Sequence, residues 1–226
     1  IKDGGWDNDS LIKIDPNSYV ASSTTAMPSS EFSGIVAIGG TLYIAENEWR
    51  CYDDIENSCQ YSNRVYKIDA SDLPGSGAQS AWSTSGKATG LLHPAEDWVN
   101  LGGLTEGASG SIWSMDKWGG QLFNFDTSGN RIGQQVWQNN WYNQNGIAYN
   151  AGVIYTTDGS QITQWTEEGN WISDTQTGTS GVNSLTFSTY LYMGQTDGDM
   201  YYAELVDSVS ADKPLGITYS GSSSSA

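Results

Sequence analysis

The chain has 226 residues, of which 26 are acidic and 9 are basic, so its formal net charge is −17. Such a surface repels phosphate backbones and anionic lipid, which excludes nucleic-acid binding and disfavours membrane attachment. Gly (27), Tyr (13) and Trp (10) are abundant, which is untypical of helical bundles. No apolar run reaches the roughly 18–20 residues that a membrane-spanning helix needs, so we expect no membrane insertion.

Short apolar segments with the pattern of β-strands recur along the chain in the same order. A partial first copy covers residues 10–15. Four fuller copies follow, with predicted strands at 34–38, 41–45 and 64–69, then 103–107, 111–116 and 121–126, then 146–149, 153–158 and 161–165, and finally 183–187, 190–194 and 199–205. Alternation of apolar and polar residues with period two is typical of half-buried strands.

Glycine dipeptides such as Gly39-Gly40 and Asp158-Gly159 separate these strands. They indicate hairpins, because glycine readily takes the positive φ of a tight reversal. Equivalent positions are 43 residues apart from Leu104 to Ile147 and 38 apart from Ile147 to Leu185. A period near 40 residues with three or four strands in each unit is typical of a β-propeller.

The units share a strand that ends in an apolar residue and Asp, as in Ile14-Asp15, Ile68-Asp69 and Phe125-Asp126. In these motifs the chain resembles the β-propeller superfamily, in particular the repeat blades of bacterial surface or secreted proteins. The resemblance covers about residues 10–206. It implies an all-β fold, a single β-propeller of about five short blades, with four blades plus an extra terminal strand as the alternative.

Five blades require the ring to close, and we expect residues 215–219 to pair beside the N-terminal strands for this purpose. A long, mostly irregular connection covers residues 71–97. We assign residues 1–219 to the propeller. Residues 220–226 consist of Ser, Gly and Ala, a composition typical of a tail or linker.

Two cysteines, Cys51 and Cys59, stand eight residues apart. A zinc site requires about four ligands, and a redox pair is more often spaced C-x-x-C. A structural disulfide is therefore the favoured interpretation. Because such bonds persist outside the reducing cytosol, we expect an extracellular or cell-surface location.

The sequence provides little for nucleophilic catalysis. A Ser–His–Asp triad requires a histidine, and the single one, His93, lies in the long connection, where a surface or structural role is favoured. Acidic residues are numerous enough for glycoside chemistry. However, Asp15, Asp69 and Asp126 occupy the same place in their units, where an Asp side chain can accept backbone N–H groups of the next turn. We therefore assign no catalytic residue.

Calcium is the one metal that the composition suggests. Asp197 and Asp199 bring oxygen ligands together, which a hard cation prefers, but without EF-hand spacing. Solvated acidic turns are the favoured interpretation, so we expect no cofactor, with Ca²⁺ at this turn as the alternative.

Aromatic and amide residues interleave after residue 136. Aromatic rings stack on the apolar faces of sugars, and amides supply paired donors and acceptors. The candidate sugar-binding residues are Trp137, Asn139, Asn140, Trp141, Tyr142 and Asn143. The alternative is that Trp137 and Trp141 pack between blades.

Two parts of the chain are candidates for glycosylation. Asn8 begins an Asn-Asp-Ser sequon for N-linked sugar. The serine run of Ser222, Ser223, Ser224 and Ser225 is a candidate for O-linked sugar.

Three classes of function remain open. The favoured one is an extracellular, non-enzymatic β-propeller that acts as an adhesive or assembly module, such as the subunit of a surface fibre. Its partners would be copies of itself or another surface protein. The second class is a carbohydrate-binding lectin whose partners are glycans, and the third is a propeller hydrolase or lyase. The low density of His, Arg and Lys counts against an enzyme.

Overall fold

The structure of the protein is a computed structural model. The described residues are 10–14, 21–26, 32–51, 59–69, 79–82, 101–116, 121–133, 136–137, 146–178, 180–188, 190–195, 200–205 and 217–219. Strands dominate these residues, and their one helical element is the 3-10 turn η3 (Ala108–Gly110). The expected all-β architecture is confirmed.

The described strands form four antiparallel four-stranded sheets and one two-stranded sheet, which we number as blades in chain order. The first blade contains β1 (Ser10–Ile14) and β2 (Ala21–Ala26). The second contains β3 (Phe32–Ile38), β4 (Thr41–Cys51), β5 (Cys59–Asp69) and β6 (Gln79–Trp82), and the third β7 (Leu101–Glu106), β8 (Ile112–Asp116), β9 (Gln121–Phe125) and β10 (Val136–Trp137). The fourth contains β11 (Gly146–Asn150), β12 (Val153–Thr157), β13 (Gln161–Thr166) and β14 (Trp171–Gln176), and the fifth β15 (Val182–Phe187), β16 (Leu191–Gln195), β17 (Met200–Leu205) and β18 (Ile217–Tyr219).

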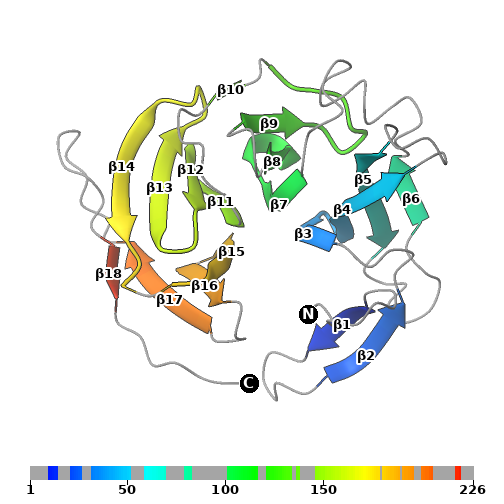
Figure 1. Ribbon diagram of the computed structural model, residues 1–226, viewed down its shortest axis with the longest axis horizontal. Coiled ribbons are helices and arrows are strands. Elements are labelled where there is room, and N and C mark those ends of the chain that lie inside the picture. Colours follow the sequence, from blue (N-terminus) through cyan, green and yellow to red (C-terminus); the bar gives the residue numbers. More distant parts are fainter. Residues whose placement is uncertain are drawn as a thin grey trace.

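The blades stand side by side around a central axis (Figure 1). In each four-stranded blade the first strand lies nearest the axis and the later strands follow outward. Along the axis β3 lies against β7, β7 against β11, and β11 against β15. The architecture is therefore a ring of radial blades, as the repeats predict.

Tight hairpins join the inner strands where the sequence predicts them. Gly39 and Gly40 have φ values of 56° and 81°, and Ala151 and Gly152 have values of 49° and 85°. Two consecutive positive φ values give a turn whose twist matches that of the strands it joins. These turns set the register in which β3 pairs with β4 and β11 pairs with β12.

Glycines on the inner strands let neighbouring blades meet backbone to backbone. A Cβ atom on Gly34 would lie 2.7 Å from the carbonyl carbon of Gly103 in the next blade. A Cβ atom on Gly146 would lie 2.7 Å from the backbone nitrogen of Leu185. No side chain fits in these spaces, so the sequence needs glycine there to bring the blades together at the axis.

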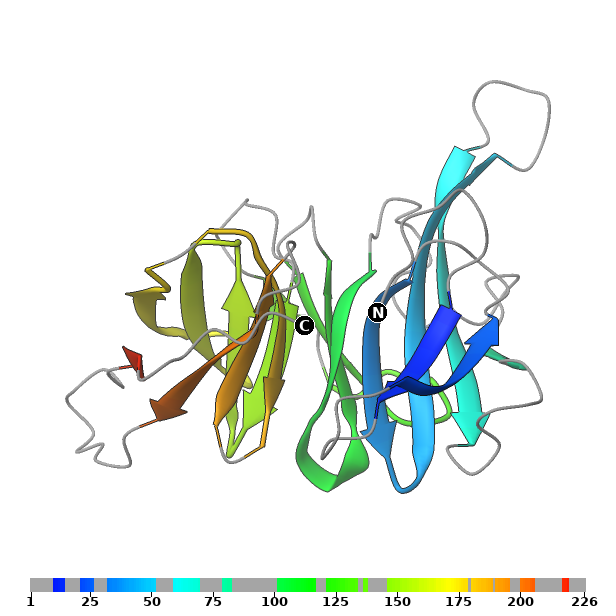
Figure 2. The same cartoon turned by 90° about the horizontal axis from the view of Figure 1, so that it is seen from below.

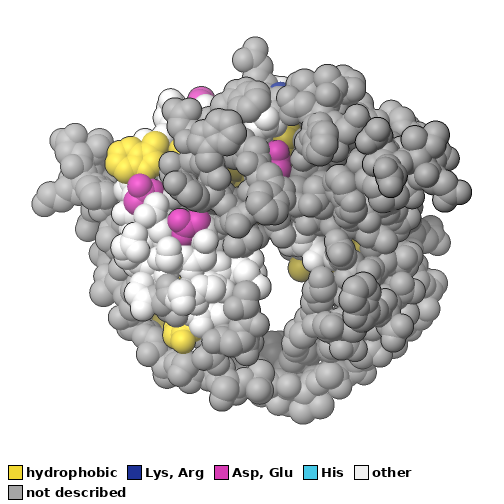
Figure 3. Space-filling view, in the orientation of Figure 1, with side chains coloured by type: hydrophobic (Ala, Val, Ile, Leu, Met, Phe, Trp, Pro, Cys, Tyr) yellow, Lys and Arg dark blue, Asp and Glu magenta, His cyan; other side chains and the backbone are white. Residues whose placement is uncertain are grey.

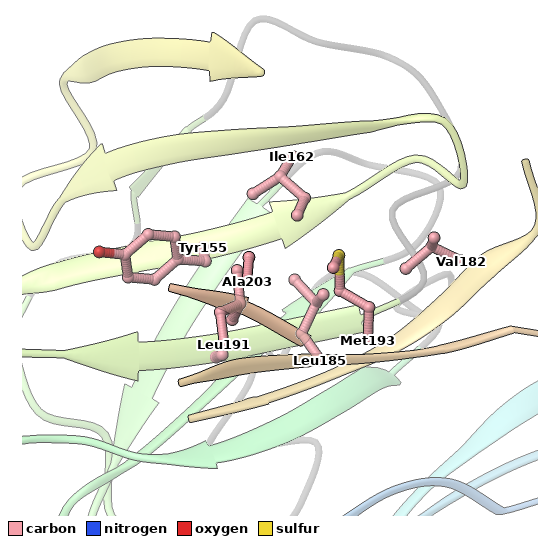
Figure 4. Packing of buried hydrophobic residues seen from close by; sticks show 8 residues of the cluster. Tyr155, Ile162, Val182, Leu185, Leu191, Met193 and Ala203 are labelled. Carbon is pink, nitrogen blue, oxygen red and sulfur yellow. The ribbon is translucent and has the colours of Figure 1, made fainter. Parts of the chain in front are cut away.

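The hydrophobic core lies between blades. Side chains alternate along each strand, so each blade presents one apolar face to the blade before it and another to the blade after it. Between the fourth and fifth blades the buried side chains are Ala148, Tyr155, Ile162, Val182, Leu185, Leu191, Met193 and Ala203 (Figure 4). Similar clusters join the second blade to the third and the third to the fourth.

The expectation for the C-terminal strand is wrong. Ile217–Tyr219 does not pair beside the N-terminal strands. It pairs with β17 as the outer strand of the fifth blade, with Tyr219 opposite Ala203 and Ile217 opposite Leu205. In the sequence each repeat shows three strands clearly, which leaves residues 215–219 without an assigned place in a blade. In the structure it fills the fourth position of its own blade and satisfies the outer edge of β17.

The second blade is longer than the others. β4 and β5 pair over eleven positions, from Thr41 opposite Asp69 to Cys51 opposite Cys59. The end of β4 and the beginning of β5 extend beyond the other blades on one side of the ring (Figure 2). The register therefore places the two cysteines directly opposite each other at the end of a ribbon, while a bond between their side chains stays a prediction.

Candidate functional site

We expected the Asp residues at the ends of the third strands to be turn residues. The structure describes one of these turns completely, that of Asp126, and there the expectation is confirmed. Asp126 Oδ1 accepts hydrogen bonds from the backbone N–H groups of Ser128 (2.9 Å) and Asn130 (2.8 Å). Its Oδ2 accepts one from Asn130 Nδ2 at 2.8 Å. The side-chain hydrogen bond from Asn130, followed by the backbone N–H groups, holds the pKa of Asp126 below its ordinary value. The carboxylate is thus engaged by its own turn.

A second set of polar side chains lies on or directly after the second strand of each four-stranded blade, three residues after an aromatic residue: Glu46, Asp116, Asp158 and Gln195. Glu46 is fully buried, and its Oε1 accepts a hydrogen bond from the hydroxyl of Tyr66 at 2.9 Å. Asp158 Oδ1 accepts hydrogen bonds from the backbone N–H groups of Ser160 and Gln161. Each of these two carboxylates is therefore held within its own blade.

The residues proposed from sequence as sites are not brought together in the described part of the chain. Trp137 stands opposite Gln121 at the edge of the third blade. The other candidates for binding sugar, calcium or glycans lie outside the described residues: Asn139, Asn140, Trp141, Tyr142, Asn143, Asp197, Asp199, Asn8, Ser222, Ser223, Ser224 and Ser225. His93 and Asp15 lie outside them as well.

Two absences hold for the described ranges. No group of three or more His, Cys, Asp or Glu residues there could hold a metal ion. No helix there has the length and apolar character that crossing a membrane requires.

The first blade stands out, because only two of its strands are among the described residues. β1 ends at Ile14 before an Asp, just as β5 ends in Ile68-Asp69, which makes β1 a third strand and β2 a fourth. Figure 1 agrees, because β1 lies on the axis side of β2. Among the described strands, β1 pairs with β2 alone. The two inner strand positions of the first blade are therefore not filled by any described strand.

The second blade forms one wall of this interval. Ile35 pairs with Ile44, and Ile44 pairs with Tyr66, so these three side chains share the face that points away from the third blade. Ile44 and Tyr66 are each 4% exposed, whereas Ile35 is 49% exposed. Its counterparts Leu104, Ile147 and Leu185 in the other blades are 4%, 1% and 7% exposed. A position that is core in three blades is thus open in the fourth.

The fifth blade forms the opposite wall. Tyr192 pairs with Tyr202, on the face opposite to the one that packs on the fourth blade. The ring of Tyr190 lies 5.2 Å from that of Tyr202 and 6.2 Å from that of Tyr192. All three tyrosines are partly exposed. Tyr155, at the place of Tyr192 in the fourth blade, is instead buried, which raises its pKa to about 12.

We call the interval between these walls the open seam, defined by Ile35, Tyr190, Tyr192 and Tyr202. Figure 3 shows an opening through the molecule next to the fifth blade, in the orientation of Figure 1. Apolar and aromatic side chains around a strand position that no described strand fills suit association with polypeptide, because burial of apolar surface and strand pairing act together.

Comparisons with known proteins bear on the fold. A streptogramin B lyase structure is similar, with a TM-score of 0.50 and 14% sequence identity, over 79% of this chain and 53% of that chain. The glutaminyl cyclase of Myxococcus xanthus gives a TM-score of 0.54 and 14% identity, over 76% and 65% of the two chains. Both are β-propeller proteins. The chain has a β-propeller fold.

At 14% identity the likeness reaches the fold and not the activity. The chain also spans little more than half of the lyase and less than two thirds of the cyclase. No protein-family model matches the chain, and no curated protein matches it by sequence.

Sequence reasoning found that the first copy of the repeat is partial, but it did not find the open seam. Ile35 reads as one more core residue, because its neighbours repeat the pattern of Leu104 and Ile147. Tyr192 reads in the same way beside Tyr155. The signal in the sequence for this site was a difference in number. The repeats contain four predicted inner hairpins but five copies of the strand that follows them.

Proposed function

We propose that this β-propeller is an extracellular, non-enzymatic assembly module of the cell surface, the subunit of a fibre or of a mixed surface complex. The observation that carries the proposal is the exposure of Ile35 in a position that is buried in every other four-stranded blade. An isolated propeller leaves this side chain and the three tyrosines partly in water. An assembly in which a partner fills the open seam buries them, and this burial favours association.

Two further features support the proposal, the first its extracellular location and the second the specificity of the assembly. Cys51 and Cys59 stand opposite each other in the register of β4 and β5, a placement that is compatible with a disulfide between them. The formal charge of −17 favours solubility and prevents non-specific association of exposed surfaces. Under these conditions specific association depends on a local apolar contact such as the open seam.

The test is made on source cells. Antibodies raised against the chain are used for immuno-electron microscopy of intact cells and of sheared surface material. We expect label on surface-attached assemblies. Cells that carry Ile35→Asp should lose labelled assemblies, whereas cells that carry Ile132→Asp, a change at an exposed isoleucine of the third blade, should keep them. Label confined to the cytosol, or assemblies that persist in the Ile35→Asp cells, would refute the proposal.

A further inference from the structure

We propose that the outer strand of the fourth blade, β14, carries a binding site for neutral saccharides, made by Trp171, Asp174 and Gln176. We call these three side chains the β14 row. The inference goes beyond the proposed assembly function and does not rest on it, because the row lies on a different blade from the residues of the open seam. It is carried by the exposure of Trp171, by the strand register and by the hydrogen bonds that orient the Gln176 amide.

The register of β13 and β14 puts the β14 row on one face of the blade. Three pairs of residues share this face: Gln161 with Gln176, Thr163 with Asp174, and Trp165 with Trp171. The β13 members are two residues apart along their strand, so they and their partners all point the same way. A bulge in the pairing accounts for the three-residue step from Trp171 to Asp174. The row spans four residue steps of β13, about 13 Å at roughly 3.3 Å per residue, which is longer than a single sugar ring.

Trp171 is exposed although the tryptophan opposite it is buried. Its exposed fraction is 58%, whereas that of Trp165 on β13 is 4%. The Trp165 ring packs between the third and fourth blades, and its indole N–H donates a hydrogen bond to Thr156 Oγ1 at 2.9 Å. Trp171 lies one strand farther out, at the outer edge of the blade (Figure 1). Its indole therefore adds little to the core and offers an apolar surface to a ligand.

The turn that precedes β14 does not require a tryptophan. In the third and fourth blades alike, the residue that begins this turn donates its backbone N–H to the carbonyl four residues on, at 2.8 Å for Asp126 and 2.9 Å for Thr166. The two turns have Gly and Asn at the same places, and Arg131 takes the position of Trp171 in the third blade. Because an arginine serves the same turn, the fold alone does not account for the indole.

Hydrogen bonds orient the Gln176 amide. Its Nε2 donates to Gln161 Oε1 at 2.9 Å, and Gln161 Nε2 donates to Thr163 Oγ1 at 3.4 Å. This arrangement leaves Gln176 an acceptor, its Oε1, beside a donor, its second N–H. A side chain that is oriented in advance loses less conformational entropy on binding than a freely rotating one.

Asp174 supplies a carboxylate between the indole and the amide. It is exposed, and in the described part of the chain no hydrogen bond or ion pair engages this carboxylate. The two acids of the preceding turn differ in this respect. Glu167 accepts a hydrogen bond from the Tyr149 hydroxyl at 2.9 Å, and a side-chain hydrogen bond with Thr166 holds the pKa of Glu168 below its ordinary value. Asp174 is thus the carboxylate of this region that is available to accept hydroxyl groups of a ligand.

A sugar matches this combination of groups. The C–H face of a sugar ring packs on an indole, while its hydroxyl groups donate to a carboxylate and pair with an amide. The formal charge of −17 disfavours anionic glycans. Figure 3 shows acidic side chains next to exposed hydrophobic surface over the outer strand of the fourth blade, which adds to this selection against anions. A basic polypeptide has the complementary charge, but it makes no use of the oriented amide, so a neutral saccharide is the ligand that uses the whole row.

The experiment measures binding of neutral saccharides to the full chain. An array of neutral glycans, with oligosaccharides of β-glucan, mannan and chitin, identifies the best ligand, and isothermal titration calorimetry gives its affinity. We expect saturable binding to one site. Trp171→Ala should weaken binding at least about tenfold, because contact with the indole buries apolar surface. Trp171→Phe should weaken it less, since a ring remains, and Asp174→Ala should weaken it through loss of an acceptor.

Two variants serve as controls. Glu106→Ala removes an exposed carboxylate of the third blade, and Ile35→Asp changes the open seam. Both should bind the sugar as the unchanged chain does. The melting temperatures of the Trp171 and Asp174 variants should stay close to that of the unchanged chain, because both side chains are exposed. Hydroxyl-radical footprinting adds a measurement without substitution, in which bound sugar should protect Trp171 from oxidation.

Three results would overturn the proposal. The first is an absence of binding to every neutral glycan of the array. The second is sugar binding that Trp171→Ala leaves unchanged and that does not protect Trp171 in footprinting. The third is binding of an oligolysine peptide, without sugar binding, that Trp171→Ala abolishes and that about 0.5 M salt suppresses, which would show a basic polypeptide as the occupant. Sugar binding itself should not respond to salt, because a neutral ligand has no charge to screen.

Discussion

The open seam makes a quantitative prediction about two equivalent side chains. Ile35 and Ile147 occupy the same place in the second and fourth blades, yet Ile35 is 49% exposed and Ile147 is 1% exposed. Replacing each by alanine removes the same three carbon atoms. The two variants therefore differ only in how much of the lost surface was buried and in whether a cavity remains.

The expected magnitudes follow from burial. A buried isoleucine changed to alanine costs about 2–5 kcal/mol of unfolding free energy, because a transfer loss and an unfilled cavity add together. Burial of three carbon groups contributes roughly 2.4 kcal/mol of transfer energy, but Ile35 is about half exposed and therefore contributes only about half of it. Water also fills the space that the shorter side chain leaves, so no empty cavity adds to the cost. We therefore expect Ile35→Ala to cost about 1 kcal/mol and Ile147→Ala to cost at least about twice as much.

The assay is equilibrium unfolding in urea, followed by tryptophan fluorescence and circular dichroism. The midpoint should move little for Ile35→Ala and much more for Ile147→Ala, at constant m-value. In thermal unfolding each kcal/mol should correspond to a shift of about 2–4 °C for a chain of this size. Equal losses for the two variants would refute the reasoning, since they would mean that Ile35 is covered in solution as Ile147 is.

Three further predictions concern other parts of the molecule. Gly146→Ala should destabilise by about 1–3 kcal/mol, because the new Cβ atom would press on the backbone of Leu185; a variant with unchanged stability would contradict the close approach of the blades. Burial raises the pKa of Tyr155 to about 12, so the folded state keeps a proton that the unfolded chain loses near pH 10. Stability should accordingly fall as the pH rises from about 10 to 12, and less steeply in Tyr155→Phe, as measured by urea unfolding across that range. Finally, non-reducing peptide mapping should find Cys51 joined to Cys59, and replacing both by serine should cost roughly 2–3 kcal/mol. Two free thiols in native material would contradict the bond and remove one support for an extracellular location.

The sequence by itself determined the type of fold and the approximate number of repeats. The period near 40 residues, the glycine turns and the recurring apolar-Asp strand ends are local patterns. Such patterns can be recognised in the sequence without knowledge of distant contacts. Gly39-Gly40 shows this well, because glycine readily adopts the positive φ values of that turn. The turn role of Asp126 was also readable, since its acceptors and donors lie within four residues of each other.

The outer strands and the candidate site needed the tertiary structure. β10 has two residues, too few for any periodicity, and its identity as a strand depends on the edge of β9 beside it. The sequence indicated a strand at residues 215–219, but the tertiary structure was needed to show that β18 pairs with β17. The same holds for Ile35 and Tyr192, whose residue types match their buried counterparts. Whether such a side chain is buried or exposed depends on the blade that stands opposite it. Only the arrangement of the ring shows that the described strands leave two inner strand positions of the first blade unfilled.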